Sequence, residues 1–195
     1  WEWMALCSTV LIWCGGTESS RRAGVRYGVL HLVGGAVLML GIAGMMVRTG
    51  SVDIGALGLD HLDSWLILIA VLINVAAPPL NAWIADAYPE STISGTVILS
   101  ACTTKTAVLA LILMFPGTSM LIGIGLLMIF HGLMYALLES DMRRMLAYSI
   151  VNQLGFMLVG IGIGTEMSIN GAAAHAVVGI FYTSLLFMAA GAVML

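Results

Sequence analysis

About seven apolar stretches occupy most of this chain, and all but the first have the ~20 residues that an α-helix needs to cross a bilayer. The first, which we expect to be truncated at its start, is shorter. The short segments between them hold most of the charged residues. The pattern predicts transmembrane helices, with a break in the third stretch where Pro78 and Pro79 remove backbone donors. The expected segments are residues 1–14, 27–47, 64–83, 96–115, 119–138, 145–163 and 171–195.

Composition supports a lipid-solvated fold. Hydrophobic residues make up 61% of the chain and charged residues 9%, whereas a soluble domain carries about a quarter charged residues. We therefore expect an all-α, polytopic transmembrane helix bundle, with residues 1–195 as a single transmembrane domain. Because the chain opens and stops inside apolar runs, we expect it to be a fragment of a longer subunit. The net charge of −3 gives no reason to expect a nucleic-acid partner.

The arginines predict an orientation. If crossings alternate, five arginines share one side of the membrane and only Arg48 lies on the other. The positive-inside rule makes the side with five arginines cytoplasmic. These five residues are Arg21, Arg22, Arg26, Arg143 and Arg144.

Lys105 is the only lysine, and it lies near the middle of the fourth segment. A charged lysine at the bilayer centre costs roughly 3 kcal/mol on insertion scales, so we expect it to face a polar or hydrated interior. Removal from water favours the neutral amine, which makes proton release feasible. The alternative is a structural lysine bonded to helix carbonyls.

Other polar groups in the apolar segments are candidates for the same pathway. Glu2 is either a buried carboxyl or an interfacial acid beside two tryptophans. Histidine suits proton relay near neutral pH, although a lone buried histidine is more often a hydrogen-bonded core residue. The histidines in question are His31, His131 and His175. Asn74 lies four residues before Pro78, at the expected helix break, and broken helices at membrane depth line protein interiors or water-filled cavities.

Three stretches resemble one family of membrane proteins. They are PPLNAWIADAYPE at 78–90, ESDMRRMLAYSIVNQLGF at 139–156, and the region from NGAAAHA at 170–176 to LLFMAAG at 185–191. In this order they resemble the antiporter-like subunits of respiratory complex I and the large subunits of Mrp-type cation/proton antiporters, most closely the D-type subunit of the latter. The resemblance covers nearly the whole chain.

The resemblance implies a fold of about fourteen helices in two inverted halves, of which this chain would supply roughly the fifth to eleventh. The family carries protons through buried ionisable groups near the membrane midplane. Glu2, Lys105 and His175 match three of these groups. They are thus the expected proton pathway, with Asn74 and His131 as weaker candidates.

Several positions depart from the family pattern. Asn74 stands where a lysine usually pairs with the glutamate, and Asn81 where a histidine is often found. Gly179 and Thr183 replace a second histidine and a lysine, whereas Arg143 keeps the charge of a usual lysine. Without its lysine partner, Glu2 tends to stay neutral in low dielectric. Asn74 can hydrogen-bond the Glu2 carboxyl and hold water, but it cannot switch the carboxyl's charge.

Two functions follow. The first is proton translocation, coupled to exchange of a monovalent cation such as Na⁺ or K⁺ or to a respiratory redox complex. The second is a non-conducting scaffold subunit of such a complex. We expect the lipid bilayer and other membrane subunits as partners and the plasma (cell inner) membrane as the location.

The chain shows no sign of redox chemistry of its own. Cys7, Cys14 and Cys102 lack metal-ligand spacing, and no glycine-rich dinucleotide motif follows a strand. We therefore expect neither cofactor nor metal. If the assembly is an oxidoreductase of the NADH:quinone type, this chain belongs to its membrane arm.

Overall fold

The computed structural model describes residues 1–193, which form eight α-helices and no strand. Five of the helices are long and apolar enough to cross a membrane, namely α2, α5, α6, α7 and α8. The prediction of an all-helical, multi-pass membrane bundle is confirmed. The helices are α1 (Glu2–Trp13), α2 (Glu18–Thr49), α3 (Leu62–Asn74), α4 (Ala82–Glu90), α5 (Ile93–Met114), α6 (Met120–Leu138), α7 (Met142–Ile163) and α8 (Glu166–Val193).

The third predicted segment is broken in two, so seven segments become eight helices. Helix α3 ends at Asn74 and α4 begins at Ala82, and the two prolines lie between them. The indole of Trp83 donates a hydrogen bond to the carbonyl of Ile73 at 3.1 Å. One carbonyl in the last turn of α3 thereby gains a partner at the break. The helix after the break runs on to Glu90, seven residues beyond the predicted end at residue 83.

Other helices begin earlier than hydropathy predicted. Helix α2 starts at Glu18 instead of residue 27, because Thr17 caps it by accepting a hydrogen bond from the Ser20 amide at 2.9 Å. Helix α7 starts at Met142 instead of residue 145, since the Asp141 carboxylate caps its first amides. Hydropathy misses such helix ends because they are charged.

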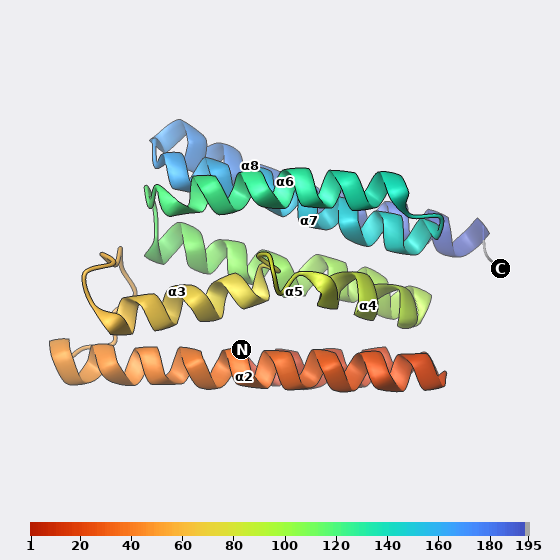
Figure 1. Ribbon diagram of the computed structural model, residues 1–195, viewed down its shortest axis with the longest axis horizontal. Coiled ribbons are helices and arrows are strands. Elements are labelled where there is room, and N and C mark those ends of the chain that lie inside the picture. The colour runs from red at the N-terminus through yellow and green to blue at the C-terminus, as the bar shows by residue number, and fades with distance from the viewer. Residues whose placement is uncertain (194–195) are drawn as a thin grey trace.

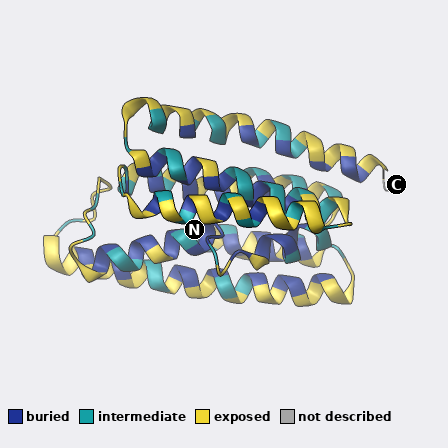
Figure 2. Cartoon of the chain, turned by 45° about the horizontal axis from the view of Figure 1, so that its top comes forward, coloured by how far each residue is buried: buried dark blue, intermediate teal, exposed yellow. Residues whose placement is uncertain are grey.

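The helices run along a common axis (Figure 1). In that view α3 and α4 lie end to end between α2 and the group formed by α5 to α8, and the N-terminus and the break between α3 and α4 lie about halfway along the axis. Helix α5 contacts α1, α3, α4, α7 and α8, which makes it the central element. Exposed residues form stripes along the outer sides of the helices, and buried residues lie on the sides that face other helices (Figure 2).

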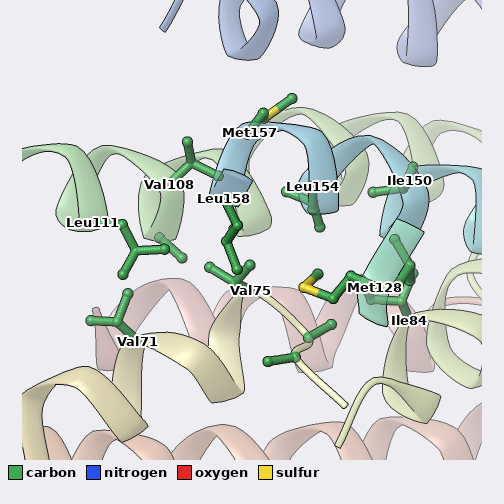
Figure 3. Close-up of a cluster of buried hydrophobic side chains, with 14 of the residues drawn as sticks. Val71, Val75, Ile84, Val108, Leu111, Met128, Ile150, Leu154, Met157 and Leu158 are labelled. Carbon is green, nitrogen blue, oxygen red and sulfur yellow. The ribbon is translucent and has the colours of Figure 1, made fainter. Parts of the chain in front are cut away.

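The apolar core lies where the broken segment, α5, α6 and α7 meet (Figure 3). It contains Val71 of α3, Val75 of the break, Val108 and Leu111 of α5, Met128 of α6 and Leu154 and Leu158 of α7. Each of these side chains is at most 1% exposed.

Helices α6 and α7 pack through glycines. A Cβ on Gly125 would stand 2.7 Å from the Gly155 carbonyl oxygen, and a Cβ on Gly155 would stand 2.6 Å from the Gly125 carbonyl oxygen. Small residues of this kind allow helix backbones to approach closely in lipid. This contact fixes α7, and with it one wall of the interior.

The arginines predicted to share a side do gather at one end of the bundle, which we call the arginine-rich end. Arg26 of α2 and Arg144 of α7 both pair with Asp86 of α4, at 3.2 and 3.7 Å. Arg48 pairs with Asp63 at the opposite end, at 2.7 Å. That the arginine-rich end faces the cytoplasm stays a prediction.

Candidate functional site

Lys105 is buried on the central helix, with 8% of its surface exposed. Its ammonium donates a hydrogen bond to the Ser100 carbonyl oxygen on the same helix at 2.6 Å. Within residues 1–193 it forms no ion pair, and this is its one hydrogen bond. An ammonium has three donors, so two remain for water or another partner.

A groove of about 360 Å³ runs beside Lys105, between α5 and α8. Cys102 and Thr106 line it on the α5 side, together with apolar residues. On the α8 side it is lined by Ala173, Ala176, Val177 and Ile180. Lys105 therefore has an opening toward α8 instead of being enclosed by its own helix.

Glu2 lies in the first turn of α1 and packs against α2 at Gly35. A Cβ on Gly35 would stand 1.5 Å from Oε1 of Glu2, so only glycine leaves room for the carboxyl. This oxygen is buried and has no hydrogen-bond partner. A buried carboxyl oxygen without a partner is costly unless water or a proton satisfies it.

Asn74 neighbours Glu2 but does not bond to it in this structure. The Asn74 side-chain oxygen accepts a hydrogen bond from the Trp1 indole at 2.9 Å, and its amide nitrogen donates to the Ala70 carbonyl at 3.0 Å. Gly34, the neighbour of Gly35, faces Asn74: a Cβ there would stand 3.5 Å from its Nδ2. Glu2 and Asn74 thus lie against two adjacent glycines of α2.

His175 lies half-buried on α8, the other wall of the groove beside Lys105. Its Nε2 is 3.4 Å from the Tyr182 hydroxyl. The resembled family has further polar groups at two positions that follow His175 on α8, Gly179 and Thr183, and both are buried here. Gly179 has only ordinary contacts around it, and the Thr183 hydroxyl donates a hydrogen bond to the Gly179 carbonyl at 2.6 Å. Thr183 therefore serves its own helix.

His131 lies half-buried on α6, away from the groove, and contacts the break between α3 and α4. Its Nδ1 is 2.8 Å from Nδ2 of Asn81, which is 4% exposed. The other histidine of the apolar segments, His31, is a core residue: its Nδ1 lies 2.9 Å from the Tyr27 carbonyl oxygen and its ring stacks on Tyr27.

The candidates share a depth. At 1.5 Å per residue, Lys105 lies about 18 Å from the start of α5, and Glu2 lies about 17 Å from the end of α1, both measured from the arginine-rich end. From the opposite end, Asn74 lies about 18 Å along α3 and His175 about 14 Å along α8. In a hydrocarbon core of about 30 Å, all four are near the middle. Helix α5 contacts the helices of the other three, α1, α3 and α8.

Two features of this region were missed by sequence reasoning. Gly35, against which the Glu2 carboxyl packs, is one of 23 glycines and carries no local signal that separates it from the others. The Asn81–His131 contact joins residues 50 positions apart. Neither is visible in a single sequence, because each depends on how two helices meet.

Comparison with known proteins gives the same family as the motifs. The family model described as NADH:quinone oxidoreductase/Mrp antiporter, TM, matches residues 1–195. The D subunit of the Na⁺/H⁺ antiporter of Alkalihalophilus pseudofirmus is 28% identical over 211 residues, covering 98% of this chain and 43% of that protein. The chloroplastic NAD(P)H-quinone oxidoreductase subunit 5 of Ipomoea purpurea is 32% identical, covering 99% of this chain and 30% of that protein.

Solved structures agree. A chain of the Mrp complex from Dietzia sp. superposes with a TM-score of 0.90 at 25% identity, covering 97% of this chain and 39% of that one. A chain of the archaeal membrane-bound sulfane sulfur reductase superposes with a TM-score of 0.86 at 25% identity, covering 97% and 43%. This chain spans less than half the length of the relatives it matches. It belongs to the NADH:quinone oxidoreductase/Mrp antiporter transmembrane family.

Proposed function

We propose that this chain is part of a proton-translocating membrane subunit, in which Glu2, Lys105 and His175, linked by water, pass protons near the middle of the bilayer. Lys105 carries the proposal. It is buried at mid-depth, has no counter-ion among residues 1–193, and lies beside a groove that leads toward the helix of His175. An ionisable group that is this costly in lipid indicates a role beyond packing.

Glu2 adds a second ionisable group to the line, on a helix that contacts α5. Its buried Oε1 has no partner, which suits a group that binds and releases a proton through water. Asn74 accepts a hydrogen bond from the Trp1 indole, and because it is uncharged it forms no ion pair with Glu2. Proton transfer between Glu2 and Lys105 therefore proceeds without the lysine that the family usually has at position 74. We expect the charge state of Glu2 to depend less on its neighbours as a result.

The names of the relatives suggest the processes to which proton movement is coupled. They include a Na⁺/H⁺ antiporter subunit and NADH-quinone oxidoreductase subunits. We propose that this chain works inside a multisubunit complex of this kind, with other membrane subunits as partners, in the plasma membrane. Exchange of protons for Na⁺ or K⁺ and coupling to a redox complex are the two forms of the proposal. Neither requires a cofactor on this chain.

A scaffold function is the second candidate, and specific contacts favour it. Lys105 bonds to a carbonyl of its own helix, Asn74 bonds to Trp1 and Ala70, and Thr183 bonds to Gly179. Each of these polar groups has a local partner. A subunit that had lost conduction would keep such bonds for stability alone.

Proton flux separates the two functions. The full-length protein with its partner subunits would be reconstituted in vesicles, and flux compared for wild type, Lys105→Ala and Asn74→Lys. Translocation predicts that Lys105→Ala lowers flux to background while the complex stays assembled, and that Asn74→Lys changes the coupling. Equal, measurable flux in wild type and Lys105→Ala would show that Lys105 is structural and refute it as a proton-transfer group. No flux in either would give the scaffold function instead.

A further inference from the structure

Asn81 connects the break in the third membrane segment to α6. It is the residue before α4, yet its side chain does not cap that helix. Its amide nitrogen instead lies 2.8 Å from Nδ1 of His131. A buried polar side chain at mid-membrane is thus directed from the broken segment toward an ionisable ring on another helix.

An amide is a partner that suits both charge states of a histidine. Neutral imidazole has one accepting nitrogen, whereas in the charged form both nitrogens donate. Asn81 can present its NH₂ group to an accepting Nδ1, and after rotation by a half-turn it can present its oxygen to a donating Nδ1. A carboxylate or an ammonium would favour one charge state strongly. The contact therefore leaves His131 free to take up and release a proton.

Aromatic rings continue from His131 toward α7. The His131 ring stacks on Tyr135, with centroids 4.4 Å apart, and Tyr135 stacks on Tyr148 of α7 at 5.3 Å. These two tyrosines are the titratable groups packed against His131, and within residues 1–193 it forms no ion pair. Their hydroxyls both donate and accept hydrogen bonds, so they can order water.

This stack points to the arginine-rich end. Tyr148 lies one turn after Arg144 on α7, and Arg144 pairs with Asp86 at 3.7 Å and with Glu139 at 3.9 Å. At 1.5 Å per residue, Tyr148 lies about 9 Å along α7, and His131 lies about 10 Å from the end of α6. Asn81 lies about 14 Å from the end of α4. Tyr135 lies about 4.5 Å from the end of α6, so the order in depth from the charged end to the break is Tyr135, Tyr148, His131 and Asn81.

We infer that His131, held by Asn81, is a proton-transfer group that connects water at the arginine-rich end with the break between α3 and α4. It receives protons by way of Tyr135 and Tyr148, whose hydroxyls order the intervening water, and passes them to the mid-membrane line. The proton moves as a proton throughout: His131 binds it on one ring nitrogen and releases it from the other. This inference rests on the proposed function, because it needs a mid-membrane acceptor.

The test uses the full-length protein with its partner subunits in vesicles and measures proton uptake from the arginine-rich side at several pH values. His131→Gln retains an amide that can bond to Asn81 but cannot bind a proton. Phe130→Leu, an exposed neighbour on the same helix, is the matched control. We expect His131→Gln to assemble normally, to take up protons more slowly by about tenfold or more, and to lose the part of the pH dependence near the histidine range.

A second variant keeps the test valid if the first one folds poorly. Exchanging the partners, Asn81→His together with His131→Asn, retains the pair with its roles reversed. We expect this double variant to recover uptake and its pH dependence relative to His131→Asn alone. A purely structural role for the pair would not restore a pH profile.

The outcomes separate this inference from the proposed function. If Lys105→Ala abolishes flux while His131→Gln and the exchanged pair both match wild type in rate and pH profile, the His131 branch is refuted and the mid-membrane line stands. If neither Lys105→Ala nor His131→Gln changes flux, both are refuted. Slowed uptake with a flattened pH profile in His131→Gln, and recovery in the exchanged pair, would support the branch.

Discussion

Gly35→Ala tests the role of Glu2 without changing Glu2. A Cβ at position 35 would stand 1.5 Å from Oε1 of Glu2, 2.3 Å from Cδ and 2.9 Å from Oε2. To reach ordinary van der Waals contact, Oε1 must move by about 2 Å. Because these atoms are the far end of a flexible side chain, the carboxyl swings away and the backbone of α1 stays in place.

The change should affect function more than stability. Alanine within a helix is favoured over glycine by about 1 kcal/mol, which offsets much of the 1–3 kcal/mol that crowding in a packed interior typically costs. The unfolding free energy should therefore change by about 1 kcal/mol or less. A displacement of even 1 Å in a group that takes part in chemistry can cost about a hundredfold in rate, so proton flux should fall by one to two orders of magnitude.

Gly34→Ala is the matched control. It makes the same substitution one residue earlier on the same helix, but the nearest atoms to its Cβ are Ile73 Cγ2 at 3.4 Å and Asn74 Nδ2 at 3.5 Å, which are ordinary contacts. The assay is proton flux in vesicles with the full complex, with thermal unfolding measured in parallel. If Gly35→Ala conducts as well as Gly34→Ala and wild type, then the position of the Glu2 carboxyl against α2 has no part in conduction.

Two further predictions concern the framework. Gly125→Ala should push α6 away from α7, because its Cβ would stand 2.7 Å from the Gly155 carbonyl oxygen and the backbone there cannot move aside; we expect the unfolding free energy to fall by about 1–3 kcal/mol. Gly123→Ala, the control, faces open space and should be neutral. Equal melting temperatures for the two variants would contradict this packing. Arg48→Leu should leave the Asp63 carboxylate without its counter-ion and lower the melting temperature. Asp63→Asn in the same background should recover part of that loss, and no recovery would show that the pair contributes little to stability.

The crossings could be predicted from sequence because lipid imposes a simple length rule. Each apolar stretch matched a helix, and Pro78 and Pro79 indicated the break that separates α3 from α4. Starts were less accurate because the first turns are polar. Thr17 and Asp141 are capping residues, and reading them as such would have moved the starts of α2 and α7 to their observed positions.

The polar interior could be predicted only in part. Lys105 was conspicuous because a single lysine in an apolar segment is costly, and its depth follows from helix geometry alone. Its bond to the Ser100 carbonyl, the packing of Glu2 against Gly35 and the Asn81–His131 contact depend on the relative rotation of helices. A hydropathy pattern contains no information on that rotation, since apolar residues are spread around the whole circumference of α1, α5 and α8.

The distribution of charges argues that the interior groups serve more than stability. All six arginines contact a carboxylate or, for Arg143, backbone carbonyls and a hydroxyl near the arginine-rich end. Lys105 and Glu2 have no opposite charge beside them within residues 1–193, although they lie where an unpaired charge costs most. A bundle selected only for stability would reverse this arrangement, with apolar residues at mid-depth. The unpaired groups are instead gathered on the helices that meet at α5, as the proposed water-linked proton transfer would need.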